Sequence, residues 1–260
     1  MSIQTTFLAL SIGNTTTSLA NIKENKISDI ETFSSQKSSK IIQSTLTRWK
    51  QNQGDEFQII IASSNEKVSQ QISATLGDQT SNEIWEIGKD LPVAIGQHLD
   101  PETITGTDRL LNAAAAWSLN QQATVIVDAG TCVTVDFVDG EGTFHGGAIA
   151  PGAAMQLQAL HKNTDSLPDI AFKRPLKEAF GKNTAQAMLQ GVFHGIRGMV
   201  RQLTEQYASR YGAYPSVIAT GGDATLLFEN DEFVEQIIPD LLLQGIASSI
   251  SHALTNEENE

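Results

Sequence analysis

Residues 125–136 read VIVDAGTCVTVD and residues 7–17 read FLALSIGNTTT, so one pattern occurs twice in the chain. In each copy an apolar run leads into a turn that contains Gly and Thr, and a second strand-like run follows. Glycine lets the backbone approach a bound group closely, while amides and hydroxyls of such a turn can line an anion site. One Gly-Asn-Thr stretch is typical of an ordinary hairpin. Two copies predict paired phosphate-binding lobes.

The sequence around each turn predicts the same order of elements, hairpins first and then alternating strands and helices. In the first half we expect strands at 7–10, 15–22, 27–33, 58–62 and 83–87, and helices at 41–49, 66–76 and 106–119. In the second half we expect strands at 123–128, 132–138, 143–150 and 216–220, and helices at 153–162 and 183–209, the latter broken or capped near its glycines. This order predicts an α/β protein of two duplicated lobes, 1–119 and 120–260, with a cleft between them.

Composition and charge restrict the function. The 260 residues are 40% hydrophobic and 18% charged, as in a soluble globular protein. A net charge of −13 argues against binding to nucleic acid or an anionic membrane, so local Arg, Lys, amides or metal must hold any anionic substrate. The single cysteine, Cys132, permits no intrachain disulfide. With neither a signal peptide nor a membrane span in the sequence, we expect a cytoplasmic protein.

Residues 106–109 read GTDR at the start of a predicted helix, with Thr107 or Asp108 at its amino end. That end presents unpaired amides and the positive end of the helix dipole. Arg109 adds a guanidinium, which can bind a carboxylate through two hydrogen bonds. The segment suits a small molecule that carries a carboxylate or a phosphate. The alternative is structural, with Asp108 as the helix cap and Arg109 in a surface ion pair.

The second turn offers further candidates. Asp128 ends an apolar strand, and a partly buried carboxylate is paired, hydrogen-bonded or bound to a cation. A turn in which Asp128 satisfies nearby amides is the structural alternative. Thr131 and Thr134 either contact phosphate or stabilise the hairpin. Asp136 either supports the turn or lies in solvent.

Other segments have weaker local signals. Residues 220–224 read TGGDA, whose bare backbone suits adenine and ribose unless it is simply a strand-to-helix turn. Thr184 is predicted to cap the helix that follows it, and Cys132 to be a small packing residue. The five histidines show no ligand spacing. Because there is no Walker loop, the charge of any bound ATP must be met by Mg²⁺, turn amides, hydroxyls and a monovalent cation.

Taken together, these motifs resemble those of the type III pantothenate kinases, of the acetate kinase/sugar kinase/Hsp70/actin superfamily. The resemblance runs along nearly the whole chain. The family's Asp-x-Gly-Asn-Thr turn is similar to residues 11–15, its Gly-x-Asp-Arg motif to 106–109, and its Asp-x-Gly-Thr-x-x-Thr-x-Asp turn to 128–136. Its Gly-Gly-x-Ile-x-Pro-Gly segment is similar to 146–152, its Thr after Gly-x-Asn to Thr184, and its Thr-Gly-Gly-Asp segment to 220–223.

The resemblance implies two RNase H-like lobes of the actin-like ATPase kind, a homodimer, and ATP-dependent phosphorylation of pantothenate at the first step of coenzyme A synthesis. It implies Asp108 as the general base and Asp128 as the ligand of a potassium or ammonium ion, with Mg²⁺ accompanying ATP. The residues implied for pantothenate are Gly106, Thr107, Asp108, Arg109 and Thr184. Those implied for ATP are Ser11, Ile12, Gly13, Asn14, Thr15, Thr16, Thr17, Ser18 and Thr131.

The sequence departs from the family pattern in two places. Ser11 replaces the aspartate expected to organise Mg²⁺ through its water shell, and a serine has no charge to balance the metal. Residues 94–98 read AIGQH, where relatives commonly have a substrate-facing tyrosine. The runner-up hypothesis is therefore a weakly active or non-catalytic relative that acts as a binding or regulatory protein. A third is a different small-molecule kinase or nucleotide hydrolase on the same fold, since fold does not determine function.

Overall fold

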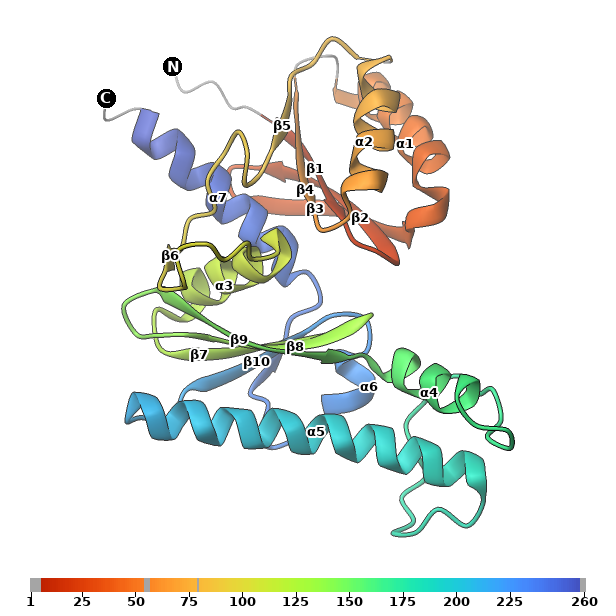
Figure 1. Cartoon of the computed structure of the whole chain (residues 1–260). Coiled ribbons are helices and arrows are strands. Elements are labelled where there is room, and N and C mark those ends of the chain that lie inside the picture. The colour runs from red at the N-terminus through yellow and green to blue at the C-terminus, as the bar shows by residue number, and fades with distance from the viewer. Residues whose placement is uncertain (1–5, 54–56, 79, 258–260) are drawn as a thin grey trace. The chain divides into compact units, whose positions relative to one another are not determined.

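The computed structural model describes residues 6–53, 57–78 and 80–257, which form two compact units (Figure 1). Unit 1 comprises Met1–Ile95, Glu102–Ser118 and Leu241–Glu260, and unit 2 comprises Gly96–Pro101 and Leu119–Asp240. The units therefore differ from the predicted halves 1–119 and 120–260 because the last helix of the chain packs with unit 1.

Unit 1 is built on a five-stranded sheet in the order β3-β2-β1-β4-β5. The β1–β2 and β2–β3 pairs are antiparallel, and the β1–β4 and β4–β5 pairs are parallel. The strands are β1 (Thr6–Ile12), β2 (Thr16–Lys23), β3 (Lys26–Ser34), β4 (Gln58–Ser63) and β5 (Ile84–Glu86). A 3-10 turn, Ser35–Lys37, precedes α1 (Ser38–Gln53), and the other helices are α2 (Glu66–Gly77), α3 (Thr107–Asn120) and α7 (Leu241–Glu257).

Both faces of this sheet are buried. Alternate residues of a strand point to opposite faces, so Leu8 and Leu10 of β1 contribute to one apolar cluster, while Phe7 and Ala9 contribute to another. The first cluster includes buried residues of α1 and α2, and the second includes buried residues of α3 and α7. The continuous apolar run that begins the chain is therefore a strand covered by helices on both sides.

Unit 2 contains a six-stranded sheet in the order β11-β10-β7-β8-β9-β6. Its strands are β6 (Gly96–Gln97), β7 (Thr124–Ala129), β8 (Cys132–Val138), β9 (Thr143–Pro151), β10 (Ser216–Thr220) and β11 (Gln236–Ile237). Its helices are α4 (Ala153–Lys162), α5 (Thr184–Tyr211) and α6 (Ala224–Phe228). All three helices contribute buried side chains to one apolar cluster with β7, β8 and β10.

The two sheets repeat one topology. Strands β7, β8 and β9 are joined by antiparallel pairs, and β7–β10 and β10–β11 are parallel. The order β9-β8-β7-β10-β11 thus reproduces β3-β2-β1-β4-β5. The predicted α/β fold of two duplicated lobes is confirmed, while the predicted cleft stays a prediction.

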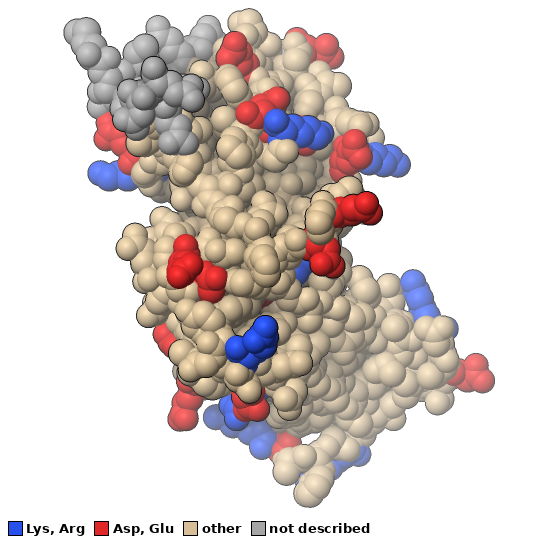
Figure 2. Space-filling view, turned by 60° about the vertical axis from the view of Figure 1, so that its left-hand side comes forward, with Lys and Arg blue, Asp and Glu red and all other residues tan. Residues whose placement is uncertain are grey.

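Some elements differ from the sequence-based expectation. Of the two alternatives for the long helix, a break near its glycines is wrong, since α5 is continuous; it is capped by Gly212, whose φ of 89° places it in the left-handed region. Residues 220–224 form the strand-to-helix turn given as the structural alternative, and α6 follows it. The sequence did not predict β6, β11 or α7. None of the helices within the described ranges is both long and apolar enough to cross a membrane. On the face in Figure 2, Lys and Arg side chains are scattered among Asp and Glu rather than gathered into a basic surface.

Candidate active-site residues

The first predicted phosphate turn connects β1 to β2 in unit 1. The Gly13 amide donates to the Thr16 carbonyl at 2.9 Å, which closes the turn. Asn14, Thr15 and Thr16 are exposed at its tip, whereas Ile12 and Thr17 are buried. The exposed tip is therefore the part of the predicted ATP-binding stretch whose side chains can meet a ligand.

Ser11 and Ser18 lie opposite each other in the β1–β2 register, just before and after this turn. Both are half-buried, and the Ser18 hydroxyl lies 2.8 Å from the Thr32 hydroxyl on β3. On its other side, Ser11 pairs with Ala62 of the parallel strand β4. The neutral hydroxyl of Ser11 thus stands at the end of a central strand, where the family resemblance implies an aspartate.

The second turn, between β7 and β8 in unit 2, is held by two neighbouring segments. The Gly152 amide, at the amino end of α4, donates to the Thr131 carbonyl at 3.0 Å. The Asp223 amide, at the amino end of α6, donates to the Ala129 carbonyl at 2.8 Å. Thr131 is exposed and Asp128 is half-buried. The structure therefore brings the second turn together with the predicted Gly-Gly-Asp segment, 221–223.

Gly221 is fitted closely against this turn. Its φ is +93°, and a Cβ atom placed on it would overlap the Ala129 carbonyl oxygen and lie 2.5 Å from Asp128 Oδ1. The bare Gly221 backbone therefore makes room for the Asp128 carboxylate. Gly222 is exposed, and a Cβ atom there would meet nothing within 4 Å. Of the two glycines, Gly222 is the one with open space for a ligand.

The surroundings of Asp223 in this cluster perturb the pKa of its carboxyl. Burial raises the pKa of its half-buried carboxyl above the ordinary 3.8, because desolvation disfavours the charged form. Its side chain makes no capping hydrogen bond to α6. Perturbed carboxylates are enriched at functional sites.

The Gly-Thr-Asp-Arg segment opens α3 in unit 1, as predicted. Asp108 and Arg109 are half-buried, and Asp108 Oδ1 accepts from the Arg109 amide at 2.8 Å. A Cβ atom on Gly106 would lie 2.6 Å from Asp108 Oδ1. A side chain on Gly106 would therefore make the Asp108 carboxylate shift from its observed position.

Two predicted local roles are wrong. Thr184 is the first residue of α5, and the cap is Asn183, whose side chain accepts from the Gln186 amide at 2.9 Å. Both residue types make good caps, and the backbone places Asn183 one step earlier. Cys132 is exposed at the start of β8 instead of packed. Asp136 is 2% exposed, which excludes the solvent-facing alternative for its side chain.

Sequence reasoning overlooked a histidine–carboxylate pair at the edge of the unit 2 sheet. His145 Nε2 lies 2.7 Å from Asp139 Oδ2, and the His98 ring lies 5.4 Å from the His145 ring. Burial alone would raise the Asp139 pKa, but hydrogen bonds from His145 and the amides of Thr143 and Glu141 lower it below 3.8. Within the described ranges, no group of three or more His, Cys, Asp or Glu is placed to hold a metal ion. Asp139 and His145 are only six residues apart, but they match no ligand or catalytic motif, so the sequence gave no signal.

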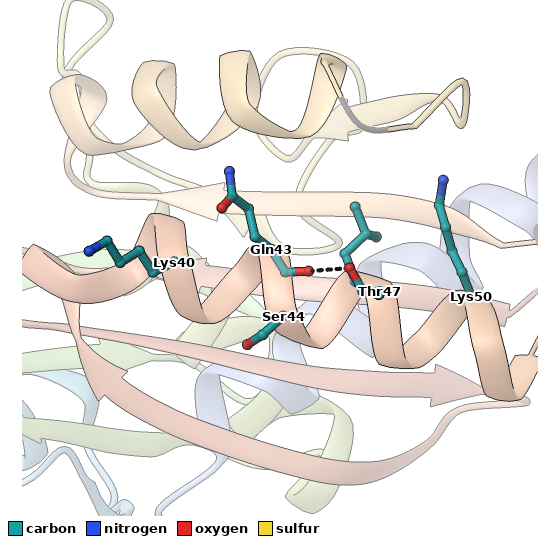
Figure 3. A pocket seen from close by; sticks show the side chains of 6 residues that line it. Lys40, Gln43, Ser44, Thr47 and Lys50 are labelled. Carbon is teal, nitrogen blue, oxygen red and sulfur yellow. Dashed lines mark hydrogen bonds between the residues drawn. The ribbon is translucent and has the colours of Figure 1, made fainter.

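Two hollows lie outside the predicted motifs. One, of about 960 Å³ in unit 2, has Phe193 with the Arg174 and Arg197 guanidiniums 5.9 Å and 5.1 Å from its ring centroid. Both arginines are paired with carboxylates, Glu229 and Asp231. The other, of about 510 Å³, lies in unit 1 and is lined by residues of α1 alone. Figure 3 shows one hydrogen bond among them, from the Thr47 hydroxyl to the Gln43 carbonyl of the same helix. Neither contains a predicted site residue.

Solved structures define the class of fold. A Baf family transcriptional activator from Campylobacter jejuni is similar with a TM-score of 0.62 at 18% identity, over 95% of this chain and 99% of that chain. MreB5 of Spiroplasma citri bound to AMPPNP is similar with a TM-score of 0.54 at 12% identity, over 98% of each chain. At these identities the likeness shows the fold alone, which is that of the actin-like ATPases.

The sequence comparison identifies the family. Residues 7–206 match the type III pantothenate kinase family, and the chain belongs to it. A type III pantothenate kinase of Rhodospirillum rubrum is 40% identical over 157 residues, 60% of this chain and 61% of the relative. One of Dehalococcoides mccartyi is 39% identical over 160 residues, 62% of each chain. The matched region thus spans about three fifths of the length of these curated relatives.

Proposed function

We propose that the protein transfers the γ-phosphoryl group of ATP to pantothenate and forms 4'-phosphopantothenate, the first intermediate of coenzyme A synthesis. The observation that carries the proposal is the opening of α3, where Gly106 leaves room for the Asp108 carboxylate. This segment lies within the region that matches the family. In this segment Asp108 can accept the proton of a substrate hydroxyl, and Arg109 can bind a substrate carboxylate.

In this proposal the first turn of α3 holds pantothenate. Arg109 binds its carboxylate, since guanidinium and carboxylate can form two parallel hydrogen bonds. Asp108 orients the primary hydroxyl and takes its proton. Gly106, Thr107 and Thr184 complete the substrate-binding set that the family resemblance implies.

The ATP phosphates are assigned to the two glycine turns. Residues 11–18 and Thr131 supply amides and hydroxyls for them. The oxygens of Asp128 suit a potassium or ammonium ion, and Gly221, which packs against this carboxylate, has no side chain to displace it. Mg²⁺, when bound with ATP, neutralises phosphate charge. Toward Mg²⁺, the side chains of Asn14, Thr15 and Thr16 present only neutral oxygens.

The chemistry needs little from the protein beyond alignment. The pantothenate hydroxyl oxygen forms a bond to the γ-phosphorus while the bond between that phosphorus and the ADP oxygen breaks. The hydroxyl proton passes to Asp108. Phosphoryl transfer depends mainly on positioning and charge stabilisation, so the acceptor need not be a strong base.

Ser11 favours a second candidate, a weakly active relative that acts by binding. A lost charged contact of this kind costs on the order of 10²–10³ in rate, by analogy with other missing transition-state contacts. The retained Asp108, Arg109 and Asp128 side chains favour the kinase instead.

The deciding experiment is formation of phosphopantothenate by the purified chain with ATP, Mg²⁺ and pantothenate, with and without K⁺ or NH₄⁺. We expect cation-dependent product. Asp108→Asn should abolish turnover and leave the unfolding temperature unchanged. Asp78→Asn, which removes an exposed carboxylate just after α2, is the matched control and should retain wild-type turnover. Absence of product from the wild type, together with ATP binding, would favour the second candidate.

We also propose a cytoplasmic homodimer. Exposed apolar side chains occur on α4 and in the segment before α5, including Met155, Leu176 and Phe180, which is 80% exposed. Exposed apolar residues of this kind are typical of a surface that another chain covers. Light scattering should give twice the 28.0 kDa mass of the chain. A single-chain mass would contradict the dimer and leave the kinase proposal in place.

A further inference from the structure

One buried residue that no sequence motif includes, Ser35, holds the first phosphate turn. It follows β3 directly and is 4% exposed. Its hydroxyl donates to the Gly13 carbonyl at 2.8 Å and lies 3.0 Å from the Thr17 hydroxyl. Its amide donates to the Thr15 carbonyl at 2.9 Å. A single residue thus contacts the turn at its beginning, its tip and its end.

A second segment supports the same turn from β4. The Ser64 amide donates to the Ile12 carbonyl at 3.0 Å. Asn65 caps α2 through its Oδ1, which accepts from the Val68 amide, and its Nδ2 donates to Asn14 Oδ1 at 3.1 Å. The exposed Asn14 at the tip is therefore tied to the amino end of a helix.

These contacts matter because a turn that binds phosphate must present its amides in a fixed arrangement. Ordering a flexible loop costs conformational entropy, and a preformed turn has met this cost before the ligand arrives. Three hydrogen bonds join Ser35 to the turn, and two of them involve its buried hydroxyl. If that hydroxyl is removed, the Gly13 carbonyl and the Thr17 hydroxyl each lose a partner, and the Ser35 amide alone still joins this residue to the turn.

We infer that Ser35 is a positioning residue for ATP, with Asn65 as a second support. Ser35 fixes residues 13–17 in the conformation that receives the phosphates, and it touches neither substrate. This inference rests on the proposed function, because it takes the first turn as a phosphate site. A purely structural Ser35 would affect stability and leave ATP affinity unchanged.

The test compares Ser35→Ala with Ser249→Ala in the full chain. Ser249 is a matched control because it is also a buried serine of unit 1, and its hydroxyl donates to the Gly245 carbonyl at 2.9 Å. The readouts are the Kd of ATP by calorimetry, the KM of each substrate and the unfolding temperature. We expect Ser35→Ala to raise the Kd and KM of ATP about ten-fold, as loss of a buried hydrogen bond allows. The KM of pantothenate for Ser35→Ala should stay within about two-fold of wild type. So should the Kd of ATP and the KM of each substrate for Ser249→Ala.

Two further variants keep the inference testable if Ser35→Ala does not fold. Ser35→Thr retains the hydroxyl and should restore ATP affinity. Asn65→Ser keeps a capping side chain for α2 but is too short to reach Asn14, and it should weaken ATP binding while α2 stays folded. Equal ATP affinity in Asn65→Ser and wild type, or in Ser35→Ala and Ser249→Ala, would overturn the inference alone. A wild-type chain that binds no ATP would overturn the proposed function as well.

Discussion

Replacement of Gly221 by alanine should damage the second turn through two independent effects. The first is conformational, since the φ of +93° is one that side chains with a Cβ rarely adopt. The second is steric, since the new methyl group would lie 2.7 Å from the Ala129 carbonyl carbon and 2.5 Å from Asp128 Oδ1. The Ala129 carbonyl cannot withdraw easily, because Ala129 belongs to the central strand β7 and accepts the Asp223 amide.

The size of the effect follows from these two terms. A residue held in an unfavourable φ region costs about 1–3 kcal/mol. Forcing an extra carbon into a packed site costs about 1–3 kcal/mol more. The sum, about 2–6 kcal/mol, is a large part of the 5–15 kcal/mol by which a domain is typically stable. With about 2–4 °C per kcal/mol for a chain of this size, the unfolding temperature should fall by at least about 4 °C.

Thermal unfolding of Gly221→Ala beside Gly222→Ala checks this reasoning. Gly222 is the next residue, exposed, with nothing within 4 Å of a built Cβ, so its variant should unfold near the wild-type temperature. Potassium dependence of ATP turnover provides a second readout, because a methyl group at position 221 would displace the Asp128 carboxylate. Equal unfolding temperatures for the two variants would refute the close approach of Gly221 to β7.

Two further predictions concern single carboxylates. Ser11→Asp should raise kcat or Mg²⁺ affinity, because it introduces the carboxylate that the family resemblance implies at this position; an unchanged or lower rate in a Mg²⁺ titration would show that the site has adapted to serine. Asp223→Asn should be more stable than wild type at neutral pH. Since burial raises the pKa of Asp223, the folded state favours the protonated carboxyl. The carboxyl therefore stabilises the folded state most below pH 3.8, and this stabilisation is lost as the pH rises through the folded-state pKa. Urea unfolding from pH 3 to 7 should therefore show the advantage of Asn fade toward low pH, and a pH-independent difference would contradict the assignment.

The central part of each lobe was predictable because its signals are local. Apolar runs of strand length end in glycine turns at 13 and 130, and the observed strands β1, β2, β7 and β8 lie where those runs predict them. The turn between β2 and β3 was also predictable: Glu24 and Asn25 adopt positive φ values of 50° and 60° in a two-residue connection. Hairpins of this kind are determined by the residues within them.

The missed elements lack such signals. Strands β6 and β11 have two residues each, and their pairing depends on β9 and β10 rather than on their own sequence. Helix α7 has neither an acidic residue in its first turn nor a basic one in its last, so its ends were not marked. Helix α5 continues past its glycines because buried residues such as Leu189, Ile196 and Val200 pack into the unit 2 core. Tertiary packing thus overrides the low helix propensity of glycine.

For the candidate site, the sequence indicated residues of the turns and not the residues that support them. The Gly-Thr-Asp-Arg segment was placed correctly because helix starts have a recognisable composition. Ser35 lies in a polar stretch, SSQKSS at 34–39, in which no residue stands out. Its role depends on a return of the chain to the first turn after the whole of β3, which only the folded structure shows.

The strand registers of the two lobes show what distinguishes their turns. Ser11 pairs with Ala62, and Asp128 pairs with Thr220, each on the parallel side of its strand, so Ser11 is the counterpart of Asp128. The residue after Thr220 is a glycine that leaves room for a carboxylate, whereas the residue after Ala62 is Ser63, whose hydroxyl donates to the Asn65 carbonyl at 3.0 Å. The first turn therefore differs from the second by a missing charge and by an added hydroxyl beside it. An aspartate at position 11 stands next to the strand end that has Ser63, whereas Asp128 stands next to the strand end that has Gly221, which is why the rate of Ser11→Asp distinguishes a lost metal contact from a turn rebuilt around neutral groups.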